Sequence, residues 1–92
     1  MSQLIRLHSA DNVLIALRAL PKGTVVEGLT LSADISLAHK VAATLILAGD
    51  PVLKYGMEIG RATADIAAGD HVHVHNMQSQ YTVTYFRSEE VT

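Results

Sequence analysis

The chain has 92 residues, 49% of them hydrophobic, which is enough for one compact folded domain and too few for two cores. Seven Lys and Arg and nine Asp and Glu are dispersed along it and give a net charge of −2, so the basic patch typical of nucleic-acid binding is missing. The absence of cysteine excludes disulfides and thiolate sites, and charged residues among the first twenty positions argue against a signal peptide or a membrane span, so we expect a cytoplasmic protein.

Six segments are expected to be strands, because residues of high β propensity are bounded there by turn residues. In chain order they are 13–17, 24–26, 40–44, 51–54, 71–76 and 81–86. Segments 11–20 and 36–49 also fit an amphipathic helix, since short apolar runs are ambiguous between the two periods. We expect at most one or two short helical turns there, and therefore a mostly β, compact domain.

One phrase occurs three times: Ala, then Leu or Ile four positions later, Gly seven later and Val ten later. The matching sets are Ala16, Leu20, Gly23 and Val26; Ala42, Ile46, Gly49 and Val52; and Ala62, Ile66, Gly69 and Val72. This order predicts a turn that its apolar residue anchors to the core and that leads into a strand. Spacings of 26 and then 20 residues, from 16 to 42 and from 42 to 62, are too unequal for a solenoid.

The stretch GDHVHVHNM, residues 69–77, carries three of the five histidines, His71, His73 and His75. In an extended strand these share one face and the two valines between them form the core face. Histidines two apart lie about 6.6 to 6.8 Å from each other along a strand, so a metal ion is more readily held by two of them than by all three. A solvated histidine face and an anion site are the alternatives. The serines lie in no nucleophile-elbow context, so a catalytic triad is unsupported.

The stretch VLKYGMEIGRA, residues 52–62, predicts a tight hairpin in which Gly56 and Gly60 bracket residues 57–59. Lys54 and Tyr55 would stand at one edge of it. A lysine there can bind a carboxylate or phosphate, or can simply be solvated. The glycine spacing does not match a dinucleotide-binding fingerprint.

Residues 39–76 contain HKVA, KYG followed by IG, ATADIAAG and HVHVHN, in that order. These motifs resemble the SAF-type N-terminal domain of the altronate and galactarate dehydratase family, and residues 5–20 are similar to the opening segment of that family. The resemblance implies a compact β-clip fold. It also implies one domain over residues 1–92, with a core at about 5–76 and a C-terminal strand and tail at 77–92.

In that family the small domain accompanies a large catalytic portion, and the enzymes remove water from sugar acids with a divalent metal, which for altronate dehydratase is Fe²⁺. The resemblance therefore implies the small subunit of a two-chain, metal-dependent hydro-lyase acting on a sugar acid such as altronate or galactarate. Its partner would be a large catalytic subunit, and homo-oligomers are plausible without that partner. Alternatives are the small subunit of a sulfolactate sulfo-lyase-like enzyme, a noncatalytic module that binds a sugar acid, and a chaperone-like SAF domain.

Elimination next to a carboxylate needs a base for a poorly acidic proton and a cation for the enediolate-like charge that develops. With this chemistry in view, His73 and His75 are the expected catalytic residues, and a pair from His71, His73 and His75 is the expected metal site. The expected substrate-binding residues are Lys54, Tyr55, His39 and Asn76. The large subunit would supply much of the active site, so the chain alone is expected to be inactive.

Overall fold

The computed structural model describes residues 3–79, which form nine short strands joined by turns, with no helix in that range. The strands are β1 (Leu4–Ile5), β2 (Val13–Ala16), β3 (Val25–Val26), β4 (Leu29–Thr30), β5 (Lys40–Ala42), β6 (Pro51–Lys54), β7 (Met57–Ala62), β8 (His71–Val72) and β9 (Met77–Ser79). Nothing in the described range is a helix long and apolar enough to cross a membrane. The expectation of a mostly β domain is confirmed.

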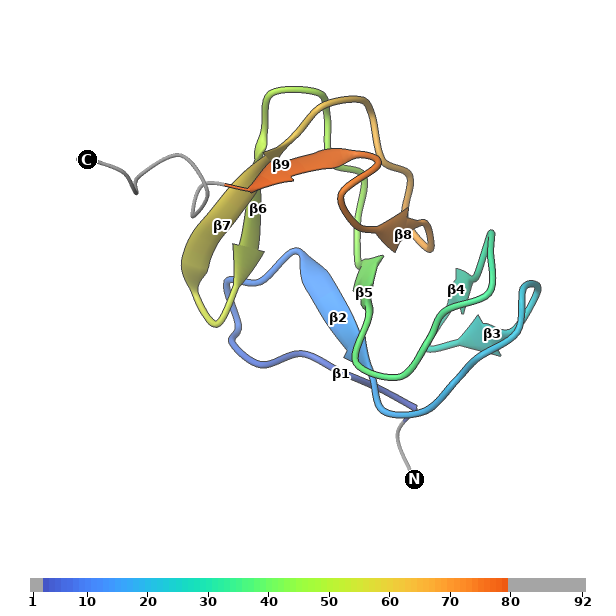
Figure 1. Cartoon of the computed structure of the whole chain (residues 1–92). Coiled ribbons are helices and arrows are strands. Elements are labelled where there is room, and N and C mark those ends of the chain that lie inside the picture. The colour runs from blue at the N-terminus through green and yellow to red at the C-terminus, as the bar shows by residue number, and fades with distance from the viewer. Residues whose placement is uncertain (1–2, 80–92) are drawn as a thin grey trace.

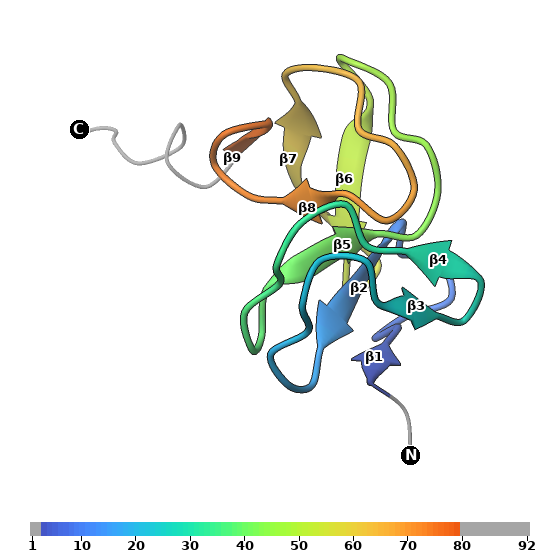
Figure 2. The same cartoon turned by 90° about the vertical axis from the view of Figure 1, so that its right-hand side faces the viewer.

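The strands form three small antiparallel sheets (Figure 1). Their orders are β1-β2-β5-β8, β3-β4 and β6-β7-β9. Figure 2 shows β5 and β8 between the sheet that contains β6 and β7 and the small β3-β4 pair. Strands β5 and β8 therefore lie in the middle of the fold, and β8, an edge strand of the four-stranded sheet, carries the first histidine of the histidine-rich stretch.

Strands β2, β3, β5 and β6 confirm the strands expected at 13–17, 24–26, 40–44 and 51–54. The two segments that also fitted a helix contain strands and turns instead. Strands β1 and β4 were not expected, whereas β7 is the second strand of the hairpin expected within residues 52–62, and β9 lies within the C-terminal strand and tail expected at 77–92. The strand expected at 81–86 lies outside the described residues.

The prediction of a strand over residues 71–76 is correct for the first two residues and wrong for the rest. β8 ends at Val72, residues 73–76 form a bend and a turn, and a new strand begins at Met77. Val72 is fully buried, as expected for the core face, but Val74 is 75% exposed. The alternation of histidine and valine is therefore not a two-faced strand.

All three copies of the repeated phrase adopt the expected conformation. Their valines are buried in β3, β6 and β8, and their glycines have φ angles of 89°, 90° and 92°. Such positive φ values are sterically easy only for glycine. The three glycines are Gly23, Gly49 and Gly69. The phrase is thus a structural unit of the fold.

Residues 31–41 form a fourth copy of this structural unit, hidden in the sequence because it lacks the glycine. Leu31, Ile35 and Val41 take the buried positions, and Ala38 stands where the other copies have glycine. Ala38 nevertheless has a φ of 71°, a conformation that costs a non-glycine residue roughly 1 to 2 kcal/mol. His39 and Lys40 follow this turn directly, so the hidden copy fixes their place in the fold.

The four copies pair in two similar halves. Leu20 and Ile35 exchange two backbone hydrogen bonds of 2.8 Å, and Ile46 and Ile66 exchange two of 2.8 and 2.7 Å. The paired segments are 16–26 with 31–41, and 42–52 with 62–72. Each half contains one hydrophobic cluster.

Strands β2 and β5 divide these two clusters. Val13 pairs with Ala42 and contributes to one cluster, whereas Leu14 pairs with Val41 and contributes to the other. Successive side chains of a strand point to opposite faces, so neighbouring residues of β2 and β5 pack into different clusters. Met77 completes the second cluster, which places the start of β9 in the core.

The hairpin expected within residues 52–62 is present as β6-β7, but its glycines have different roles from those expected. The turn consists of Tyr55 and Gly56, both with positive φ, and residues 57–59 belong to β7. Gly60 lies inside β7, where a Cβ atom would collide with the carbonyl oxygen of Gln78 in β9. Glycine is needed there because the backbone of β9 approaches closely.

Candidate functional site

The pairing of β5 with β8 brings distant histidines together. Val41 lies opposite His71 and Lys40 opposite Val72, so His39, the residue just before β5, lies beside His73. His39 Nδ1 is 3.0 Å from His71 Nε2, and the ring centroids of His39 and His73 are 5.0 Å apart. The three ring centroids of His39, His71 and His73 form a triangle with sides of 5.0 to 5.4 Å at the edge of the four-stranded sheet.

His71 and His73 are almost parallel, with a centroid separation of 5.4 Å and an interplanar angle of 9°. His75 is exposed and tilted, with its ring centroid 5.5 Å from that of His71 and an angle of 39° between the planes. Among residues 3–79, ligand atoms of His39, His71 and His73 all lie within 4.8 Å of one another. We call these three side chains the histidine cluster.

The turn that carries His73 is closed by the side chain of Asn76. Its Nδ2 donates a hydrogen bond of 2.8 Å to the carbonyl oxygen of His71, and its Oδ1 accepts one of 3.0 Å from the amide of His73. The amide of Asn76 also donates to the carbonyl oxygen of His73 at 3.1 Å. Asn76 therefore shapes the backbone that presents two of the clustered histidines.

The surroundings favour neutral imidazoles. Burial lowers the pKa of His71, and the nearby charges of His39, His73, His75 and Lys40 lower it further. The pKa of His73 is lowered in the same way, by burial and then by the surrounding cationic groups. A neutral imidazole has a free lone pair for a proton or a metal ion.

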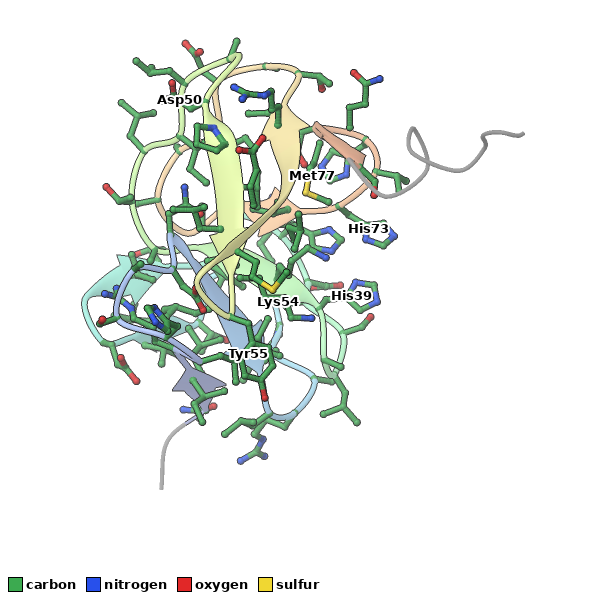
Figure 3. The ribbon with its side chains drawn as sticks, turned by 90° about the vertical axis from the view of Figure 1, so that its left-hand side faces the viewer. His39, Asp50, Lys54, Tyr55, His73 and Met77 are labelled. Carbon is green, nitrogen blue, oxygen red and sulfur yellow. The ribbon has the colours of Figure 1, made fainter. Side chains whose placement is uncertain are left out.

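Two lysines add positive charge to this region. Burial lowers the pKa of Lys40, and the charge of Lys54 lowers it further. Figure 3 shows His39 and His73 at one edge of the molecule, with Lys54 and Tyr55 on the β6-β7 hairpin in the same view. An anionic group that approached this region would meet both lysines.

A buried aspartate holds the hairpin in place. Asp11 accepts hydrogen bonds from the amides of Gly56 and Tyr55, at 2.7 and 2.9 Å. Burial raises the pKa of Asp11, but these two amides and His8 lower it by more, so the pKa lies below the ordinary value of 3.8. The ionised carboxylate therefore stabilises the turn from which Tyr55 projects, 65% exposed, next to Lys54.

The structure thus brings together three of the expected site residues, His39, His71 and His73, and places Lys54 and Tyr55 on the neighbouring hairpin. The polar atoms of the Asn76 side chain are engaged by backbone groups. The sequence analysis expected His39 to bind substrate and did not group it with the metal ligands. Its position after the hidden fourth turn, opposite β8, was the signal that was missed.

The histidine cluster fits a divalent metal ion in its chemistry. Imidazole nitrogen suits zinc, iron, copper and nickel, and three such donors leave a coordination position open. The 3.0 Å between His39 Nδ1 and His71 Nε2 is close to the roughly 3.3 Å that separates two ligands at tetrahedral bonds of about 2.05 Å.

Known proteins share the motifs of this chain. The family model described as the altronate/galactarate dehydratase SAF domain matches residues 2–80. This chain belongs to that family. The altronate dehydratase of Escherichia coli (strain K12) is 48% identical over 81 residues, which are 84% of this chain and 16% of that protein.

Two further relatives are similar to this SAF domain. The altronate dehydratase of Bacillus subtilis (strain 168) is 41% identical over 83 residues, which are 86% of this chain and 17% of that protein. The (2R)-sulfolactate sulfo-lyase subunit alpha of Paracoccus pantotrophus is 46% identical over 52 residues, which are 56% of this chain and 78% of that subunit. The SAF domain thus spans only 16 to 17% of the two altronate dehydratases.

Proposed function

We propose that this SAF domain is the small subunit of a two-chain, metal-dependent hydro-lyase that removes water from a sugar acid such as altronate or galactarate. Family membership supports the lyase class. The single observation that carries the site is the histidine cluster, whose members His71 and His73 feel the charge of Lys40, which in turn feels the charge of Lys54. Neutral bases next to fixed positive charge are what elimination beside a carboxylate requires.

The lysines bind and orient the substrate in this proposal. Lys54 holds the carboxylate of the sugar acid, and Lys40 adds to the positive potential that offsets the charge developing on that group. Tyr55 forms the outer wall of the site and offers a hydroxyl to the substrate.

A histidine outside the metal site moves the proton. A metal ion bound by His39, His71 and His73 would occupy the lone pair of each of these rings, whereas the exposed His75 keeps a free ring nitrogen. His75 therefore takes the proton next to the carboxylate and returns it to the departing hydroxyl group. A divalent metal ion such as Fe²⁺ bound at the histidine cluster would add stabilisation of the enediolate-like charge.

A large subunit completes the site. Figure 3 shows His39 and His73 at the edge of the fold, and the altronate dehydratases devote more than four fifths of their length to other parts of the protein. A catalytic centre needs a water-excluded pocket. The partner therefore closes over the histidine cluster and the β6-β7 hairpin, and the SAF domain alone is inactive.

The second candidate is the small subunit of a sulfolactate sulfo-lyase-like enzyme. The observation in its favour is that the match covers 78% of a protein named as subunit alpha, a separate small chain. The same residues would serve, since this reaction also needs a base beside a carboxylate, and sulfite would leave in place of hydroxide.

The test is to purify the SAF domain together with the large dehydratase-like chain encoded in the same genome. Altronate, galactarate and sulfolactate are then assayed with each chain alone and with the complex. Turnover by the complex only, on a sugar acid, is the expected result. Full turnover by the large chain alone would refute the catalytic-subunit proposal, and turnover of sulfolactate alone would favour the second candidate.

A further inference from the structure

We infer that His39, His71 and His73 form a three-imidazole site that binds one divalent transition-metal ion on this chain alone, without a partner. The inference rests on the proposed function for the use of that ion in catalysis. Binding itself depends only on these three side chains. This ligand set differs from the one that the strand pattern predicted, because it takes His39 in place of His75.

The distances allow one ion to contact all three rings. Each residue offers a ring nitrogen, and these nitrogens lie within 4.8 Å of one another. Ligands of a tetrahedral ion with bonds of about 2.05 Å lie roughly 3.3 Å apart, so the widest pair has to close by at most about 1.5 Å. Rotation of partly exposed imidazoles achieves such a movement, whereas His39 and His71 already meet the distance.

The backbone that carries the ligands is fixed in advance. His39 follows the turn in which its amide donates a hydrogen bond of 3.0 Å to the carbonyl oxygen of Ser36, and it leads into β5. His71 belongs to β8, which pairs with β5, and His73 is held by Asn76. Because strand pairing and a closed turn set all three positions, little conformational entropy is lost when the ion binds.

The donor set selects the metal. Three neutral imidazoles suit Zn²⁺, Fe²⁺, Co²⁺ or Ni²⁺, while Mg²⁺ and Ca²⁺ prefer oxygen ligands. In the group found within residues 3–79, no carboxylate joins the three histidines. The site is therefore expected to discriminate strongly against Mg²⁺.

The positive charge of Lys40 repels a cation bound at the histidine cluster. Its charge acts on His71 and His73, so it reduces metal affinity. The same positive charge attracts anions to a metal ion that has an open coordination position. A carboxylate would then be held by the metal ion and by Lys40 and Lys54 together. The site is thus suited to an ion that binds with moderate affinity and more tightly when an acid is present.

The experiment measures binding of Zn²⁺ and Co²⁺ to the tag-free chain at pH 7.5, by calorimetry and by the visible absorption of Co²⁺. One ion per chain with a dissociation constant in the micromolar range or below, and no detectable binding of Mg²⁺, is expected. His39→Gln, His71→Gln and His73→Gln should each weaken binding by at least about 100-fold, because each removes one of three ligands. His8→Gln, which changes a histidine outside the cluster, is the matched control.

His75→Gln separates the two possible ligand sets. Retention of affinity in His75→Gln with loss in His39→Gln supports the site, and the reverse pattern overturns it in favour of a site built from the loop alone. Absence of Zn²⁺ and Co²⁺ binding to folded protein also overturns it. Circular dichroism of every variant checks folding, and a variant that does not fold is replaced by the corresponding Asn substitution. If binding fails while the two-chain complex still eliminates water, the inference fails and the proposed function stands.

Discussion

The carboxylate of Asp11 accepts a hydrogen bond of 2.7 Å from the amide of Gly56, 45 residues further along the chain. The same carboxylate accepts one of 2.9 Å from Tyr55, so a single side chain satisfies both amides of the β6-β7 turn. Asp11 is only 5% exposed. The first loop of the chain therefore positions the hairpin that presents Lys54 and Tyr55.

Replacement of Asp11 by Asn is expected to lower the free energy of unfolding by roughly 1.5 to 3 kcal/mol, the range for hydrogen bonds to a charged group. The side-chain amide of Asn has only one atom that accepts hydrogen bonds, its oxygen, because its nitrogen is a donor. One of the two backbone amides therefore loses its partner. Urea denaturation at pH 7 measures the change. An unchanged midpoint would show that the carboxylate does not stabilise the turn.

The same residue predicts a dependence on pH. The folded-state pKa of Asp11 lies below 3.8, so its contribution is fully present above the unfolded value and is lost as the pH falls through the lower folded value. Stability is therefore expected to decline below about pH 4 in the native chain, and to decline less in Asp11→Asn. Equal acid sensitivity of the two proteins would contradict the assignment.

Gly69 and Gly49 provide a matched pair for testing the repeated turn. Both have φ near 90°, but a Cβ on Gly69 would strike the carbonyl oxygen of Thr30, whereas a Cβ on Gly49 meets nothing within 4 Å. Gly49→Ala is expected to cost about 1 to 2 kcal/mol, from the left-handed backbone alone. Gly69→Ala should cost a further 1 to 3 kcal/mol or so, from the collision. Thermal denaturation of both variants gives the difference, and equal losses would refute the close approach.

The core was accessible to sequence analysis because its signal is local. Ala, an apolar anchor, Gly and Val at fixed spacing report backbone conformation and burial together, and all three expected copies are present. The fourth copy was hidden because Ala38 adopts a left-handed φ without being glycine. Pairing between copies supplies the context that holds it there, and no short-range pattern encodes that pairing.

The histidine cluster could be predicted only in part. A period of two suggested a strand through residue 76, but Asn76 closes a turn with its side chain and ends the strand at Val72. Asparagine favours turns for this reason, yet its signal is weaker than five alternating residues. The place of His39 beside His71 depends on the register between β5 and β8, which links residues 32 positions apart.

Asn76 is predicted to act as a positioning residue for metal binding. Asn76→Ala removes both side-chain hydrogen bonds to the backbone of His71 and His73, which should weaken Zn²⁺ binding by roughly 10- to 100-fold. The absorption spectrum of bound Co²⁺ should also change, because the ligand geometry loosens. Gln78→Ala, at an exposed position of β9, is the control. A loss of thermal stability with unchanged affinity and spectrum would assign Asn76 a structural role only.

Lys40 is predicted to limit the affinity of the histidine cluster for metal. Its partly buried ammonium group lies close enough to His71 and His73 to lower the pKa of both, and the same repulsion acts on a bound cation. Removal of one such charge is worth about 1 kcal/mol, so Lys40→Gln should tighten Zn²⁺ binding by about fivefold. Calorimetry at low and high salt measures this, and the difference from the native chain should shrink as salt screens the charge. Lys22→Gln, in the exposed turn of the first copy of the repeated phrase, should leave the affinity unchanged. Weaker binding in Lys40→Gln would mean that the lysine supports the ion, for example by holding an anion that bridges to it.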